Sequence, residues 1–155
     1  MKLIKKEEGL IPCTPLGIVN LLDYYQIDIN ADIVIIGRSR LVGLPLFHLL
    51  EGRGATVTLC HSKTKNLKKF TQNADILIVA VGKPGLITKD MVKESAVVVD
   101  VGITRIEDKI YGDVKNDVIE KVKVITPVPG GVGPMTVVSL MENVFNAYKL
   151  QEKDK

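Results

Sequence analysis

The 155-residue sequence contains no tryptophan, and aromatic residues make up only 5% of it. Cysteine and histidine occur twice each, as Cys13, Cys60, His48 and His61. With so few ligands and no metal-like spacing between them, the sequence predicts no metal site. Cys60 and His61 are adjacent, but neighbouring strand residues point to opposite faces, so we exclude a nucleophile–base pair. Both cysteines are expected to be free thiols.

Long hydrophobic runs are also missing. No apolar stretch approaches the roughly 20 residues of a membrane-spanning helix, and the start of the chain lacks the apolar core of a signal peptide. We therefore expect no membrane association and a cytoplasmic location. The net charge is only +3, and basic residues gather in segment 61–69. Nucleic-acid sites usually show denser basic patches interleaved with aromatics, so this cluster favours a small polyanion over nucleic acid.

What the sequence does contain is an alternation of short apolar runs with helix-like segments. Thr14 is expected to cap an opening helix with Pro15 at its first position, and Pro134 to start a last helix that ends near Leu150. Strands that are apolar on both faces are typical of a covered parallel sheet. The alternation predicts an α/β domain with a doubly wound, mostly parallel, Rossmann-like sheet. The strands are expected at 33–36, 56–60, 76–81, 96–101 and 124–126, the helices at 42–51, 66–73, 88–93 and 117–121, and a short strand or hairpin arm at 110–114.

The loop after the first predicted strand carries Gly37, Arg38 and Ser39, and Gly43 begins the next helix. Ligands of doubly wound sheets bind beyond the carboxyl ends of the strands. The spacing is not the G-x-G-x-x-G fingerprint. Even so, a glycine allows close backbone approach, a helix N-terminus offers N–H groups, and Arg38 is a forked donor suited to phosphate. A tight turn with a solvated arginine explains this loop equally well.

The loop after the second predicted strand contains Ser62, Lys63, Thr64 and Lys65. In NAD enzymes an acid about 20 residues beyond the first glycine binds the ribose 2′-hydroxyl. This sequence has hydrogen-bond donors there instead, which suit a 2′-phosphate. The loop therefore favours NADP over NAD, while a charged surface loop remains the alternative.

The fourth predicted strand ends at Asp100, Gly102 and Ile103. We expect Ile103 to lie against a nicotinamide ring. Asp100 is a weak candidate for an acid or base, because a strand-end aspartate more often binds nearby backbone N–H groups.

Several motifs resemble one family, the bifunctional methylenetetrahydrofolate dehydrogenase/cyclohydrolases. They are PCTPLGI (12–18), IGRSRLVGLP (36–45), TVTLCHSKT (56–64), ADILIVAVGKPG (74–85), VVVDVGI (97–103), YGDV (111–114) and TPVPGGVGPMT (126–136). Their order and spacing are similar to those of the NAD(P)-binding domain of that family.

The resemblance implies a role for each candidate site residue. It places Gly37, Arg38 and Ser39 at the cofactor phosphates, Ser62 at the 2′-phosphate and Ile103 at the nicotinamide. The turn of Pro129, Gly130 and Gly131 approaches the place where folate and nicotinamide meet.

The family's catalytic lysine, the tyrosine four residues before it and its folate-binding aspartate belong to another domain, which this sequence does not match. We therefore assign no catalytic residue. We expect residues 1–13 to be a remnant of the inter-domain segment, 14–150 to be the NAD(P)-binding domain and 151–155 to be a polar tail. The resemblance implies the NADP-binding portion of the enzyme, inactive on folate by itself. The alternative is a non-enzymatic dinucleotide-binding or interaction module derived from the family.

The last predicted helix has an apolar side that includes Leu140, Val144 and Ala147. In a two-domain enzyme this side would pack partly on the other domain. Exposed apolar patches favour association. We therefore expect this chain to form a homo-oligomer.

Overall fold

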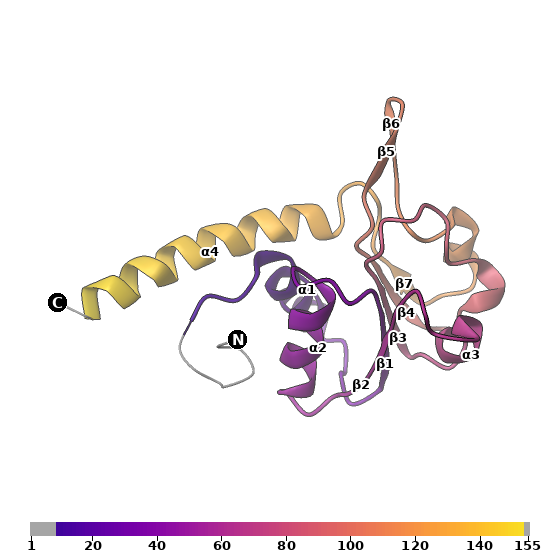
Figure 1. The fold of residues 1–155 in the computed structure, drawn as a ribbon, viewed down its shortest axis with the longest axis horizontal. Coiled ribbons are helices and arrows are strands. Elements are labelled where there is room, and N and C mark those ends of the chain that lie inside the picture. Colours follow the sequence, from indigo (N-terminus) through magenta and orange to yellow (C-terminus); the bar gives the residue numbers. More distant parts are fainter. Residues whose placement is uncertain (1–8, 154–155) are drawn as a thin grey trace.

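A computed structural model describes residues 9–153, which contain a five-stranded parallel sheet (Figure 1). The chain runs from β1 outward to β2 and then returns to β3 on the other side of β1, so the strand order reverses between β1 and β3. This arrangement confirms the expected doubly wound α/β fold. The strands, in spatial order, are β2 (Thr56–Cys60), β1 (Asp32–Ile36), β3 (Ile76–Val79), β4 (Val97–Asp100) and β7 (Val124–Ile125).

Helices cover both faces of the sheet (Figure 1). On one face lie α1 (Cys13–Tyr24) and α2 (Gly43–Glu51). The other face is covered by α3 (Leu67–Thr71) and the two short 3-10 helices η1 (Lys89–Met91) and η2 (Asn116–Glu120). The long helix α4 (Val132–Lys153) packs along α1 and then extends beyond the rest of the domain.

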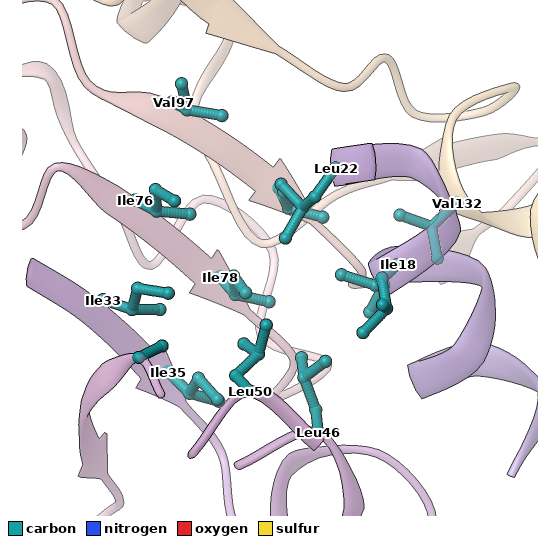
Figure 2. Packing of buried hydrophobic residues seen from close by; sticks show 13 residues of the cluster. Ile18, Leu22, Ile33, Ile35, Leu46, Leu50, Ile76, Ile78, Val97 and Val132 are labelled. Atoms are coloured by element: carbon teal, nitrogen blue, oxygen red, sulfur yellow. The ribbon is translucent and has the colours of Figure 1, made fainter. Parts of the chain in front are cut away.

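Side-chain alternation along the strands divides the core into two clusters. On β1 and β3, Ile33, Ile35, Ile76 and Ile78 face α1 and α2, where they meet Leu46 and other helix residues (Figure 2). The intervening residues, Val34, Ile36, Leu77 and Val79, face the other helical layer. Burying each such side chain contributes about 1.5–3 kcal/mol. The sheet is therefore buried on both faces, as its uninterrupted apolar strands predict.

Two helix starts differ from the expectation. The first helix begins at Cys13 with Pro12 at its N-cap, so Thr14 lies inside the first turn and Pro15 is not the first helical residue. The Thr14 hydroxyl accepts a hydrogen bond from the Thr136 hydroxyl on α4 (3.1 Å). The last helix begins at Val132 and includes Pro134 in its first turn, where a missing N–H has little cost.

The predicted helices at 88–93 and 117–121 are only the 3-10 helices η1 and η2. Each segment is anchored on the sheet by a single fully buried residue, Val92 or Val118, whereas a longer helix needs an apolar stripe. Of the segment predicted at 110–114, only residues 110–111 lie in a hairpin arm. The hairpin is formed by β5 (Thr104–Ile106) and β6 (Lys109–Tyr111) and projects from the domain (Figure 1), whereas Val114 forms an isolated bridge with Ile87.

The contact between α1 and α4 consists largely of small and polar groups. A Cβ atom on Gly17 would lie 2.9 Å from the Met135 backbone, so the two helices approach closely only because residue 17 is glycine. Asn143 is buried and donates to the Ile11 carbonyl (2.6 Å). The apolar side chains of α4 mostly point away from the domain: Leu140 is 49% exposed and Val144 is 61% exposed, while Ala147 is half-buried.

The predicted division into 1–13, 14–150 and 151–155 stays a prediction. Its outermost residues, 1–8 and 154–155, lie outside the described part of the chain, in which α4 continues to Lys153. Among residues 9–153, no helix has the length and apolar character needed to cross a membrane.

Candidate dinucleotide-binding site

Two glycines shape the loop between β1 and α2. Gly37 has a φ of +113°, and a Cβ atom there would overlap the Ala80 carbonyl oxygen at the end of β3. A Cβ atom on Gly43 would overlap the Gly37 carbonyl oxygen. The loop can therefore fold back against β3 and against the start of α2 only because both residues lack a side chain. These glycines make room for the protein's own backbone.

Ser39 occupies the start of α2. Its hydroxyl oxygen accepts hydrogen bonds from the N–H groups of Val42 (3.0 Å) and Gly43 (3.5 Å), and its carbonyl oxygen accepts one from Leu44 (3.0 Å). The sequence-based expectation of free N–H groups at this helix N-terminus is therefore wrong, because Ser39 accepts from them. The hydroxyl proton of Ser39 can still be donated to a phosphate oxygen.

Arg38 lies beside this turn with its side chain exposed. Within residues 9–153 it has no ion-pair partner, and neither does the equally exposed Arg40, which the sequence analysis did not consider. The turn thus presents two guanidinium groups and one hydroxyl to solvent. A phosphate group suits such a set of donors.

The loop after β2 lies beside the loop after β1, because the Gly37 N–H donates to the Cys60 carbonyl (2.9 Å). Thr64 holds the loop by accepting from the His61 N–H (2.9 Å). This leaves Ser62 exposed, together with Lys63 and Lys65. The structure therefore groups exposed cationic and hydroxyl side chains at two adjacent strand ends. Cys60 itself is buried, and burial raises the pKa of its thiol.

A cavity of about 450 Å³ lies beyond the ends of β4 and β7. Ile103 lines one side of it, and the turn of Pro129, Gly130 and Gly131 lines another, so the structure brings these predicted residues together. Gly130 has a φ of +104° and open space where a side chain would stand. Gly37, Arg38, Ser39 and Ser62 do not line this cavity; they lie at the neighbouring ends of β1 and β2, and Val42 connects the two areas.

Asp100 forms the buried end of β4 and behaves as the sequence analysis expected. Its carboxylate accepts N–H groups of Gly102 (3.0 Å), Asp113 (2.9 Å) and Val114 (3.0 Å). Burial raises the pKa of the Asp100 carboxyl, and the three donors partly offset that effect. Asp100 thus stabilises the backbone at the site.

Asp113 is the site residue that sequence reasoning missed. It is fully buried, and its carboxylate accepts the N–H groups of Val81 (2.7 Å), Gly82 (3.0 Å) and Lys83 (2.6 Å) in the loop after β3. The one available signal was the motif YGDV (111–114), in which an aspartate stands between Gly112 and an apolar residue, and to which no site role was assigned. Among the described residues, no group of three His, Cys, Asp or Glu side chains could hold a metal ion.

A doubly wound sheet with a glycine turn at its switch point and cationic loops beside it defines a dinucleotide-binding domain. Residues 12–152 match the family described as "Tetrahydrofolate dehydrogenase/cyclohydrolase, NAD(P)-binding domain", and this chain belongs to that family.

Known relatives agree with this assignment. The chain is 54% identical over 154 residues to "Bifunctional protein FolD" of Acholeplasma laidlawii, covering 98% of this chain and 56% of that protein. The bifunctional enzyme FolD-methylenetetrahydrofolate dehydrogenase/cyclohydrolase of Campylobacter jejuni has a similar structure, with a TM-score of 0.91, 52% identity, and coverage of 96% of this chain and 54% of that one. The chain thus spans about half the length of the relatives that it matches.

A second similar structure was solved with ligands. It is the methylenetetrahydrofolate dehydrogenase-cyclohydrolase of Trypanosoma brucei complexed with NADP cofactor and inhibitor, with a TM-score of 0.89, 36% identity, and coverage of 97% of this chain and 55% of that one. A more distant structure, the glutamyl-tRNA reductase from Methanopyrus kandleri, has 14% identity and a TM-score of 0.57, covers 94% of this chain and 41% of that one, and shows only that the fold is shared.

Proposed function

We propose that this chain binds NADP and is the cofactor-binding portion of a methylenetetrahydrofolate dehydrogenase/methenyltetrahydrofolate cyclohydrolase of one-carbon folate metabolism. The observation that carries the proposal is the pairing of two strand-end loops: Arg38 follows β1, and Ser62 with two exposed lysines follows β2, and neither loop contains an acidic residue. A 2′-phosphate fits this surface, whereas an NAD ribose lacks its usual carboxylate partner. The NADP bound to the Trypanosoma brucei relative supports the same choice.

The proposed site residues form two groups, one for each half of the cofactor. Arg38 and Ser39, in the backbone turn that Gly37 permits, bind the phosphates and Ser62 binds the 2′-phosphate, at the ends of β1 and β2. Ile103 lies against the nicotinamide in the cavity whose other wall is formed by residues 129–131. Hydride transfer needs the nicotinamide ring and the folate carbon to be held together, and the cofactor supplies the chemistry. In the proposed arrangement folate approaches the ring from the side of residues 129–131.

Among the described residues that line the cavity, only Asp100 has a side chain that could act as an acid or base in the cyclohydrolase step. The two buried carboxylates beside the cavity, Asp100 and Asp113, each accept three backbone N–H groups. We therefore propose that the chain alone does not turn over folate, and that the reacting side chains come from a domain or chain with the family's catalytic lysine.

Calorimetric titration with NADP⁺ and NAD⁺ tests the cofactor. We expect NADP⁺ to bind at least about tenfold more tightly, since the charged 2′-phosphate adds charge-assisted hydrogen bonds. Replacing Lys63 and Lys65 together by alanine should remove most of this preference. Lys123→Ala, an exposed lysine at the opposite end of the sheet, is the matched control and should leave it unchanged. Equal affinities for NADP⁺ and NAD⁺ in the unmodified chain would contradict the proposal.

An activity assay tests the enzymatic part. With NADP⁺ and methylenetetrahydrofolate the chain alone should show no reduction of the cofactor. Addition of the separately produced catalytic domain of a FolD relative should produce turnover. Turnover by the chain alone would disprove the claim of inactivity. Binding of NADP⁺ without turnover in the mixture would instead support the non-enzymatic binding module.

We also propose that the chain forms a homo-oligomer in the cytoplasm. The exposed apolar side of α4 supports association, because a patch of this kind is uncommon on a monomer. Two free cysteines, one half-buried and one buried, suit a reducing compartment. Sedimentation from micromolar to near-millimolar concentration should show dimers or larger species, and a monomer throughout would contradict the proposal.

A further inference from the structure

We propose that Asp113 is a positioning residue for the nicotinamide half of the cofactor. Its carboxylate joins the backbone after β3 to the segment after β4, which lines the cavity proposed for that half. The inference rests on the proposed function and extends it to a residue that touches neither substrate nor cofactor.

The first step concerns the turn after β3. The N–H groups of Val81, Gly82 and Lys83 converge on one carboxylate, at 2.7, 3.0 and 2.6 Å. Successive N–H groups that point to one place form a concavity that binds anions. Here the protein fills that concavity with Asp113. A cofactor phosphate therefore has no donors to bind at this turn, which leaves the pyrophosphate to the turn after β1.

The second step concerns the segment after β4. A Cβ atom on Gly102 would overlap the Asp113 carboxylate, so this carboxylate packs directly on the backbone at residue 102. Val101 and Ile103, on either side of Gly102, both line the 450 Å³ cavity. Asp113 therefore lies directly behind one wall of the cavity.

The third step concerns how Asp113 is itself fixed. Asp100 accepts the Asp113 N–H (2.9 Å), and the Thr126 hydroxyl after β7 accepts the Asp100 N–H (2.9 Å). The ends of β3, β4 and β7 are thus linked through two buried carboxylates and one hydroxyl. Because these backbone segments are already ordered, they need not reorganise when a ligand binds. Movement of Asp113 would shift the turn after β3 and the cavity wall together.

The test is the variant Asp113→Asn. Asparagine has the same shape but only one acceptor oxygen, and its amide hydrogens would face the N–H groups of the turn. The matched control is Asp108→Asn, a fully exposed carboxylate in the hairpin turn, which forms an ion pair of 3.4 Å with Arg105.

Affinity is measured for two ligands, NADP⁺ and adenosine 2′,5′-bisphosphate, which lacks the nicotinamide half. We expect Asp113→Asn to weaken NADP⁺ binding at least about tenfold, equivalent to one charge-assisted hydrogen bond, and to change adenosine bisphosphate binding less than about threefold. Equal losses for both ligands would indicate a purely structural role and overturn the proposal, as would no loss for NADP⁺. If the unmodified chain binds neither ligand, the proposed function fails as well.

A second measurement covers the case in which Asp113→Asn does not fold. In the unmodified chain, NADP⁺ should shift the backbone amide resonances of Val81, Gly82 and Lys83, and adenosine bisphosphate should leave them in place. Shifts of the same size with both ligands, or none with NADP⁺, would overturn the proposal.

Discussion

The loops at the carboxyl ends of β3 and β4 bury polar side chains that are fully hydrogen-bonded. The outer face of α4, by contrast, exposes large apolar side chains to solvent. In the loops, the buried carboxylates of Asp100 and Asp113 each have three N–H partners. On α4 the large apolar side chains lie in solvent, and the one buried hydroxyl, that of Ser139, has no hydrogen-bond partner among the described residues. The exposed apolar residues of α4 are Val137, Val138, Leu140, Met141, Val144, Phe145 and Tyr148.

The strand-end loops and the outer face of α4 differ in the source of their stabilising contacts. The loops are ordered by groups of this chain, because six of their backbone N–H groups donate to the carboxylates of Asp100 and Asp113. The outer face of α4 packs little against the described residues, although helices are normally stabilised by packing their apolar face. Substitutions in the loops should therefore change the stability of the isolated chain, and substitutions on the outer face of α4 should change its association.

The largest effect is expected for Gly37→Ala. The φ of +113° strains any residue with a side chain, and the new Cβ atom would overlap the Ala80 carbonyl oxygen. We expect the free energy of unfolding to fall by about 3 kcal/mol, as for other strained and overpacked sites. Urea denaturation measures this change.

Gly54→Ala is the control for strain alone. Gly54 has a φ of +90° but no atom within 4 Å of the position of a Cβ atom. It should cost about 1 kcal/mol, the usual penalty for the left-handed region. Equal losses for Gly37→Ala and Gly54→Ala would show that the close packing of the loop on β3 contributes no stability.

An effect of opposite sign is expected for Ser139→Ala on the inner face of α4. The substitution removes a buried hydroxyl without a partner and introduces a better helix former, so the chain should gain about 1 kcal/mol. Asn143→Ala on the same face should instead cost about 1–2 kcal/mol, because it leaves the Ile11 carbonyl without its donor. Thermal unfolding of both variants measures these two changes in stability. A loss of stability in Ser139→Ala would show that the Ser139 hydroxyl has a hydrogen-bond partner.

The sequence predicted the sheet well, since five short apolar runs between helix-like segments admit few other folds. It also located Ile103 and Pro129 on one cavity, because both follow strands at the same edge of the sheet. It missed the role of Asp113 and the hydrogen bonds that Ser39 accepts from the start of α2, because both depend on contacts that no local pattern encodes. Asp113 reaches N–H groups about 30 positions earlier in the chain, and Ser39 accepts from the helix N-terminus that was expected to bind phosphate.

A smaller effect on stability is expected for charges on the outer face of α4. Replacing both Met141 and Phe145 by lysine should change the free energy of unfolding by less than about 0.5 kcal/mol, because both side chains are more than half exposed. Self-association should weaken strongly, since four like charges would face each other in a dimer of this face. Sedimentation and urea denaturation measure the two quantities, and unchanged association would assign the oligomer to another surface.

The smallest effect is expected for Asp90, whose carboxylate is exposed on the surface, in contrast to the buried carboxylates of Asp100 and Asp113. Hydrogen bonds from Lys68 and Thr88 hold the pKa of Asp90 down to about 2. A lowered pKa contributes stability above the unfolded-state pKa, near 4, and that stability is lost as the pH falls toward about 2. When the pH is lowered from about 5 to about 2, the free energy of unfolding should therefore fall slightly less for Asp90→Asn than for the unmodified chain. Melting temperatures across this range measure the slopes. Asp108→Asn serves as the control, and identical slopes for Asp90→Asn and the unmodified chain would mean that solvent screens the Lys68 pair completely.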